Sequence, residues 1–178
     1  EVNNISLAFG GVKAITDTSF NVLEHEVRAI IGPNGAGKSS MLNCINGIYK
    51  PQQGTVSFRG KEIPNITPNI MAQMGLSRTF QNLALFKRMS VLDNILVGRK
   101  LHTKTNFLEV ALHLPKVKKE EKFNRDRSEE IISFLEIEDI KDTPVGKLPY
   151  GLQKKVELGR ALATDSTIIL LDEPMAGM

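Results

Sequence analysis

The fold of this chain is decided by the stretch Gly32-Pro33-Asn34-Gly35-Ala36-Gly37-Lys38-Ser39, which fits the pattern G-x-x-x-x-G-K-[ST] at every fixed position. A loop that wraps a phosphate turns its backbone N–H groups inward, and glycine adopts the dihedral angles that this requires at little cost. A helix that begins at Lys38 would point an N-terminus of about half a positive charge at the same anion. The stretch therefore predicts a phosphate-binding loop.

The side chains of this loop predict a nucleotide as its ligand. Lys38 supplies a mobile cation for the β- and γ-phosphates, and the Ser39 hydroxyl can ligate Mg²⁺. The alternative, a glycine-rich turn that fits the pattern by accident, is disfavoured because an apolar run at residues 27–31 precedes the loop and a helical pattern at residues 38–48 follows it. The expected nucleotide-binding residues of the loop are Gly32, Pro33, Asn34, Gly35, Ala36, Gly37, Lys38, Ser39 and Ser40.

A second site element is the apolar run at residues 168–171, which ends in Asp172 and Glu173. A carboxylate at the carboxyl end of a strand lies in the crevice where open α/β sheets bind ligands. We expect Asp172 to hold the metal and Glu173 to polarise the water that attacks the γ-phosphate. An apolar run ending in two acids is weak evidence alone, but together with the loop it predicts a magnesium-dependent nucleotide hydrolase.

Composition and charge exclude several other classes of protein. The chain has 178 residues, of which 41% are hydrophobic and 24% charged, so it can bury a substantial core. A net charge of +3 is too small to argue for nucleic-acid binding. No run approaches the roughly 18 apolar residues of a membrane-spanning helix, and no secretory signal is visible. The single cysteine, Cys44, excludes an internal disulfide and is expected to be a small core residue, while three scattered histidines show no metal-ligand spacing.

Hydrophobic patterning predicts an α/β protein with a helical middle. Near residues 128–135 the apolar residues Ile131, Ile132 and Leu135 fall on one side of a helix, and Val91 and Ile95 also have helical spacing. The charged run at residues 116–122 is expected to be a solvated helix face or loop. Strands are expected at residues 5–9, 19–23, 27–31, 55–59 and 167–171, turns at 10–11, 51–54 and 164–166, and helices at 38–48 and 152–163.

The segment Leu148-Pro149-Tyr150-Gly151-Leu152-Gln153-Lys154-Lys155 resembles the signature that ABC ATPases place at the start of a helix. Four other motifs follow the same family in the right order: the phosphate loop, Asp172-Glu173-Pro174, Gln81 within Thr79-Phe80-Gln81-Asn82, and Phe9 at the position of an aromatic that stacks on adenine. The wording of Phe9-Gly10-Gly11, of residues 78–81 and of the signature looks like the ATPase subunits of branched-chain amino acid importers.

The resemblance implies ATP and Mg²⁺ as the cofactors and assigns roles to single residues. Phe9 would stack on the adenine; the alternative is an ordinary aromatic of the core. Gln81 would contact the metal and the attacking water; the alternative is a surface glutamine. By this resemblance the catalytic residues are Glu173, Gln81 and Lys38, and the metal ligands are Ser39, Gln81 and Asp172.

The signature residues Tyr150, Gly151, Leu152 and Gln153 would act on the nucleotide of a second subunit, so the resemblance implies a head-to-tail dimer. The family commonly has Ser at position 149, Gly at position 150 and Gln at position 152. We expect a working but altered signature in which Pro149 is not a ligand, because proline is compatible with the first position of a helix.

The implied fold is α/β: an ABC-type P-loop NTPase core with a mostly parallel sheet, N-terminal antiparallel strands and an inserted helical subdomain. Residues 1–81 and 164–178 would form the core, and residues 82–163 the helical subdomain. In this family a histidine and its strand follow the acidic strand, so we expect a longer protein. A protein of these 178 residues alone is expected to leave strand edges unpaired and to fold poorly.

The implied function is that of the ATP-binding and ATP-hydrolysing subunit of an importer. Its partners would be transmembrane permease subunits, an identical or different second ATPase subunit and, indirectly, a solute-binding protein, at the cytoplasmic face of the inner membrane. Residues 82–89 are expected to dock on the permease, with Leu83, Leu85 and Phe86 either in contact with it or in the core. The alternatives are a soluble ABC-type ATPase, a catalytically weak partner subunit and a small-molecule phosphotransferase.

Overall fold

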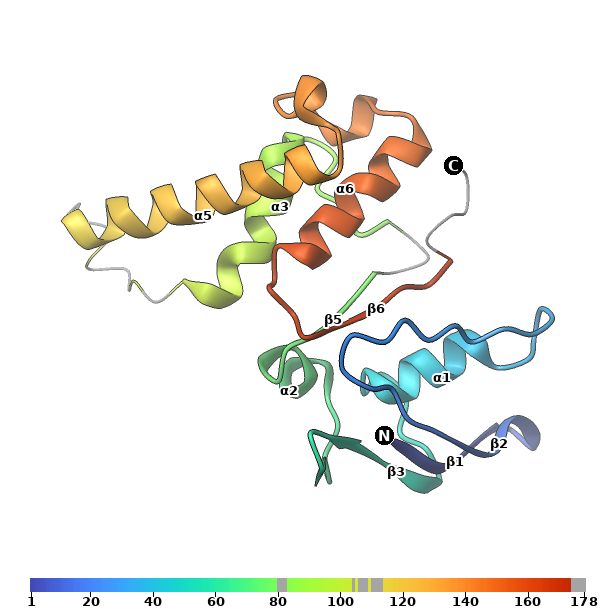
Figure 1. Ribbon diagram of the computed structural model, residues 1–178. Helices are drawn as coiled ribbons and strands as arrows, with labels where there is room; N and C mark the ends of the chain where they lie inside the picture. Colours follow the sequence, from blue (N-terminus) through green and yellow to red (C-terminus); the bar gives the residue numbers. More distant parts are fainter. Residues whose placement is uncertain (80–82, 104, 106–108, 110–113, 174–178) are drawn as a thin grey trace. The chain divides into compact units, whose positions relative to one another are not determined.

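The computed structural model describes residues 1–79, 83–103, 105, 109 and 114–173. Contacts divide the chain into two compact units, Glu1–Met74 and Gly75–Met178. Figure 1 shows both units, and each is described by itself. The division expected from the sequence, a core of residues 1–81 and 164–178 with a helical subdomain of residues 82–163, stays a prediction. No helix among the described residues has both the length and the apolar character needed to cross a membrane.

The first unit is built on a four-stranded sheet in the order β2-β1-β3-β4. Strand β1 (Val2–Phe9) pairs antiparallel with β2 (Val12–Phe20) and with β3 (Gln53–Phe58), which continues into β4 (Lys61–Glu62). The strands expected at residues 5–9 and 55–59 are therefore confirmed, as is the turn at residues 10–11. The strand expected at residues 19–23 is wrong in its limits, because Phe20 pairs with the first residue of β1 and the residues beyond it have no partner there.

Two helices complete this unit, α1 (Lys38–Ile45) and α2 (Pro68–Gln73). Helix α1 buries Met41, Cys44 and Ile45, which confirms Cys44 as a core residue, and burial raises the pKa of its thiol. The helix ends at Ile45, three residues earlier than expected. The reason is Gly47, whose φ of +76° is left-handed and whose Cβ, if it had one, would stand 2.7 Å from the backbone of Thr67.

The apolar run at residues 27–31 forms no strand, although the sequence predicted one. Val27 is 98% exposed and Ile31 is 90% exposed. A strand is stable only when its N–H and C=O groups find partners, and within the described residues no strand pairs with this run. The prediction of a strand at residues 27–31, in front of the phosphate loop, is therefore wrong.

The second unit combines a parallel pair of strands with a helical core (Figure 1). Strand β5 (Leu76–Arg78) pairs with β6 (Ile168–Leu170), which is half-buried rather than buried as predicted. The helices are α3 (Val91–Gly98), α5 (Pro115–Phe134) and α6 (Tyr150–Leu162), with the 3₁₀ turns η1 (Arg99–His102), η2 (Glu138–Ile140) and η3 (Val145–Lys147). Helix α6 starts two residues before its predicted start.

The core of the second unit lies where α3, α5 and α6 meet. Among its members are Val91, Ile95, Ile131, Ile132 and Leu135, which are all less than 10% exposed. The amphipathic pattern predicted for residues 128–135 is therefore confirmed.

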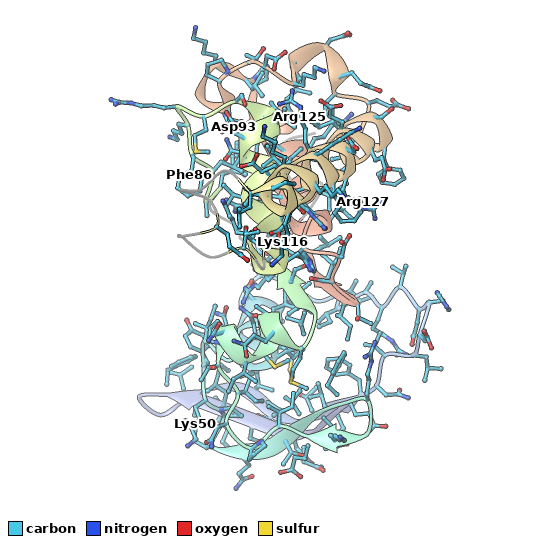
Figure 2. All side chains as sticks on the ribbon, turned by 90° about the vertical axis from the view of Figure 1, so that its left-hand side faces the viewer. Lys50, Phe86, Asp93, Lys116, Arg125 and Arg127 are labelled. Carbon is cyan, nitrogen blue, oxygen red and sulfur yellow. The ribbon has the colours of Figure 1, made fainter. Side chains whose placement is uncertain are left out.

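The opposite face of α5 carries charge. Lys116, Arg125 and Arg127 are exposed and project from this helix (Figure 2). The charged run at residues 116–122 is a solvated helix face, as expected. An antiparallel sheet, a parallel strand pair and packed helices together confirm the α/β class.

Candidate functional site

The phosphate loop owes its path to two glycines with left-handed backbones. The φ angles are +82° at Gly35 and +83° at Gly37. Gly37 caps the N-terminus of α1 and lies against β2, where an added Cβ would stand 2.3 Å from the carbonyl oxygen of Ala14. A side chain at position 37 is therefore excluded by contact as well as by conformation.

Lys38 folds back over this loop. Its Nζ donates to the carbonyl oxygens of Gly32 and Pro33, both at 2.9 Å. This places an ammonium group beside the N-terminus of α1, while residues 32–36 remain exposed. An accessible loop with left-handed glycines, a helix N-terminus and a cation fits a phosphate group.

Phe9 lies at the end of β1, in the same unit as the loop. Its side chain is 47% exposed, and its ring meets that of Tyr49 edge to face, with centroids 5.1 Å apart and planes at 75°. The ring is neither buried in the core nor isolated in water, so part of it is free to accept a stacked base. Its assignment to adenine stays a prediction.

Asp172 follows β6 in the second unit and is 6% exposed. Its Oδ2 accepts a hydrogen bond from Nη2 of Arg78 at 3.1 Å, and both side chains are buried. The backbone N–H of Asp172 donates to Oγ1 of Thr79 at 3.3 Å. The next residue, Glu173, is exposed and has a left-handed φ of +47°. The chain thus fixes one carboxylate firmly and presents the other outward.

The oxygen ligands among these residues suit Mg²⁺ better than they suit a metal ion that is bound by protein side chains alone. Among the described residues no group of three or more His, Cys, Asp or Glu side chains could hold a metal ion. Mg²⁺ is usually bound by one or two carboxylates together with waters and substrate phosphates. Asp172 offers a single carboxylate of this kind, while Ser39 as a second metal ligand stays a prediction and Gln81 lies outside the described residues.

The signature segment forms the first turn of α6, with Pro149 as its N-cap. Tyr150 is 47% exposed, and the Nζ of Lys154 lies 5.9 Å from its ring centroid. The side-chain amide of Gln153 donates to the carbonyl oxygen of Leu148 at 2.8 Å, and Leu152 packs against the helical core. Gln153 and Leu152 are therefore engaged within their own unit, while Tyr150 faces outward.

The segment expected to dock on a partner is fastened to α3 by the fully buried Asn94. Its side chain accepts from the N–H of Phe86 at 2.9 Å and donates to the carbonyl oxygens of Phe86 and Ser90 at 3.1 and 2.9 Å. Leu85 is partly buried against the core, so for this residue the core alternative holds. Phe86 is 51% exposed and is labelled in Figure 2.

Sequence reasoning missed Arg78, the buried partner of Asp172. A signal was present, because Arg78 directly precedes the Thr79-Phe80-Gln81 motif. It also missed Tyr49 and Gln52, which contact the end of β1. No motif marks either of these two residues.

Comparison with known proteins identifies the family. The model of the ABC transporter family matches residues 15–176. The chain belongs to the ABC transporter family. Membership makes it an ABC-type ATPase with the P-loop NTPase fold.

Two curated ABC relatives match nearly the whole chain. The high-affinity branched-chain amino acid transport ATP-binding protein BraF of Pseudomonas aeruginosa is 35% identical over 178 residues, which are 100% of this chain and 70% of that protein. The probable branched-chain amino acid transport ATP-binding protein LivG of Methanocaldococcus jannaschii is 38% identical over 175 residues, covering 98% of this chain and 67% of the relative.

Solved ABC structures agree with the fold. A nucleotide-free ATP-binding cassette from an ABC transporter has a TM-score of 0.81 and 37% sequence identity, over 99% of this chain and 69% of that chain. An ATP-binding cassette in its ADP conformation gives the same values. The ABC-type fold expected from the five motifs is thereby confirmed.

Proposed function

We propose that the chain is the ATP-binding and ATP-hydrolysing subunit of an importer for branched-chain amino acids. The observation that carries the proposal is the match of 98–100% of the chain to two ATP-binding proteins named for branched-chain amino acid transport. This favours an importer over a soluble ABC-type ATPase. The solute itself would be selected by a binding protein and the permease.

The chain's own residues would divide the work on ATP as follows. The N–H groups of residues 32–40 and the Lys38 ammonium hold the β- and γ-phosphates, which requires the ammonium to exchange the carbonyls of Gly32 and Pro33 for phosphate oxygens. Ser39 and Asp172, with Gln81, would hold Mg²⁺, which supplies charge neutralisation of the phosphates when bound. Glu173 would take the proton of the attacking water.

The proposal includes three kinds of partner. The exposed Tyr150 and the half-buried Gly151, with the following backbone of α6, would complete the nucleotide site of a second ATPase subunit. Transmembrane permease subunits would contact the segment around Phe86. A solute-binding protein would act on the permease from the other side of the membrane. The subunit would then lie at the cytoplasmic face of the inner membrane.

Transport itself tests this function. We expect vesicles that carry the assembled transporter, with this subunit and MgATP inside and labelled leucine outside, to accumulate the leucine. Lys38→Met keeps an unbranched side chain of similar length but removes its charge, so uptake should fall to background. The matched control is Lys118→Met, at an exposed position of α5, which should transport normally. Undiminished uptake by Lys38→Met, or no uptake of any branched-chain amino acid by the wild type, would contradict the proposal.

A further inference from the structure

The segment that follows α1 turns back and forms hydrogen bonds with the end of β1. The side chain of Gln52 makes two hydrogen bonds with one residue: its Oε1 accepts from the N–H of Ala8 at 2.9 Å and its Nε2 donates to the carbonyl oxygen of Ala8 at 3.1 Å. The N–H of Gln52 also donates to the carbonyl oxygen of Ser6 at 2.9 Å. Ala8 directly precedes Phe9, so the backbone that carries the Phe9 ring is held by Gln52 as well as by its pairing with β2.

Tyr49 contacts the Phe9 ring itself. The edge-to-face geometry, with centroids 5.1 Å apart and planes at 75°, is one that aromatic pairs prefer. Tyr49 is in turn fastened to α1, because the N–H groups of Ile48 and Tyr49 both donate to the carbonyl oxygen of Asn43, at 2.9 and 3.1 Å. Tyr49 therefore links the Phe9 ring to α1.

Helix α1 thus serves two parts of the same unit. Its first residue, Lys38, belongs to the phosphate loop, and the turn after its last residue carries Tyr49. A half-exposed ring at the end of a strand, followed by two glycines, would otherwise be free to change rotamer. Fixing such a ring before a ligand arrives removes an ordering cost from binding.

We infer that Tyr49, supported by Gln52, is a positioning residue that holds the Phe9 ring ready for the adenine of ATP. The inference rests on the proposed function, in which Phe9 stacks on the base. Tyr49 contacts the ring edge to face, and the ring keeps an exposed part for the ligand. The phosphate loop and the base platform are then set relative to each other by one short helix and its C-terminal turn.

The test separates base recognition from phosphate recognition. Affinity of the full chain is measured by calorimetry for MgATP and for magnesium tripolyphosphate, which has the phosphates but no base. We expect Tyr49→Leu to weaken MgATP binding about two- to tenfold, the range for one aromatic pair. Binding of tripolyphosphate should not change. A merely structural role of Tyr49 would weaken both ligands equally.

Three further variants serve as controls. Tyr49→Phe keeps the ring and should bind both ligands as the wild type does, because the ring contact does not need the hydroxyl. Lys50→Ala changes the exposed neighbour of Tyr49 (Figure 2) and should leave the ratio of the two affinities unchanged. Phe9→Leu should weaken the binding of MgATP but not of tripolyphosphate. Adding Tyr49→Leu to it should lower the MgATP affinity little further, because both changes remove the same interaction.

The outcomes separate the role of Tyr49 from the role of Phe9 and from the proposed function. Equal losses for both ligands in Tyr49→Leu, or no loss at all, would overturn the role of Tyr49 while leaving the proposed function intact. A Phe9→Leu variant with full affinity for MgATP would overturn the role of Phe9 itself, and with it the positioning role. A wild-type chain that binds neither ligand would contradict the proposed function.

Discussion

At the scale of single residues, the two left-handed glycines of the phosphate loop differ in their surroundings. Gly35 has no atom within 4 Å of an added Cβ, whereas at Gly37 the Cβ would meet the Ala14 carbonyl oxygen at 2.3 Å. Both positions have positive φ, so alanine at either is strained. Only position 37 adds a collision with backbone, which cannot move as a flexible side chain would.

This difference gives a matched pair of variants. Gly35→Ala should lower the free energy of unfolding by about 1 to 2 kcal/mol, the cost of a left-handed L-residue. Gly37→Ala should cost more and should also weaken tripolyphosphate binding more strongly, because relief of the contact shifts the start of α1. Chemical denaturation and calorimetry measure the two effects. Equal losses in both variants would contradict the account.

The residues of the loop could be predicted because the motif describes one continuous piece of backbone whose geometry is local. The surroundings of Asp172 could not be predicted in this way. Its partner Arg78 is 94 positions away in the chain, and the pair becomes visible only when β5 and β6 lie side by side. The contact of Tyr49 with Phe9 is also between distant residues. Residue-level prediction therefore succeeded for local geometry and missed the partners that packing brings.

At the scale of elements, a network around Asp165 joins η1, α5 and the turn before β6. The Asp165 carboxylate accepts hydrogen bonds from the buried Arg99 and from Arg127, and the His102 ring lies 4.0 Å away. Burial alone would raise the pKa of Asp165, but the hydrogen bond and charge of Arg99, with those of Arg127, outweigh it and hold the pKa below 3.8. The network therefore contributes stability only while Asp165 is ionised.

A lowered pKa fixes the sign of the pH dependence. Above the ordinary value of 3.8 the contribution of Asp165 is fully present. As the pH falls through the lowered folded pKa, the unfolded chain already holds the proton and the contribution is lost. We expect the stability difference between wild type and Asp165→Asn to be largest at neutral pH and to shrink below pH 3.8.

Denaturant titrations at several pH values measure that difference. The matched control is Asp126→Asn, which changes an exposed carboxylate on α5 and should not show the same decline. A difference between wild type and Asp165→Asn that grows on acidification would contradict the account.

The elements themselves were predicted unevenly, for physical reasons. The helical periodicity of residues 128–135 predicted a helix correctly, because one apolar stripe packs on α3 and α6. The end of α1 depended on the close approach of Gly47 to Thr67, which no local pattern shows. The run at residues 27–31 has strong strand propensity, but a strand requires a partner, and none lies beside it within the described residues.

At the scale of the whole molecule, the residues expected to act on ATP belong to two units. The phosphate loop and Phe9 belong to the first unit, while Asp172, Glu173 and the signature helix belong to the second. The proposed function assigns the phosphate contacts to residues of the first unit, and the metal and water contacts to Ser39 of that unit and to Asp172 and Glu173 of the second.

The most direct test of this account is ATP turnover by the assembled transporter, compared between wild type and Glu173→Gln. Glutamine keeps the size of the side chain but cannot accept the proton of the attacking water. The account predicts that the variant still binds MgATP with similar affinity and hydrolyses it about a hundredfold or more slowly, as expected for loss of a general base. Equal turnover by the two proteins, or no turnover by the wild type, would contradict it.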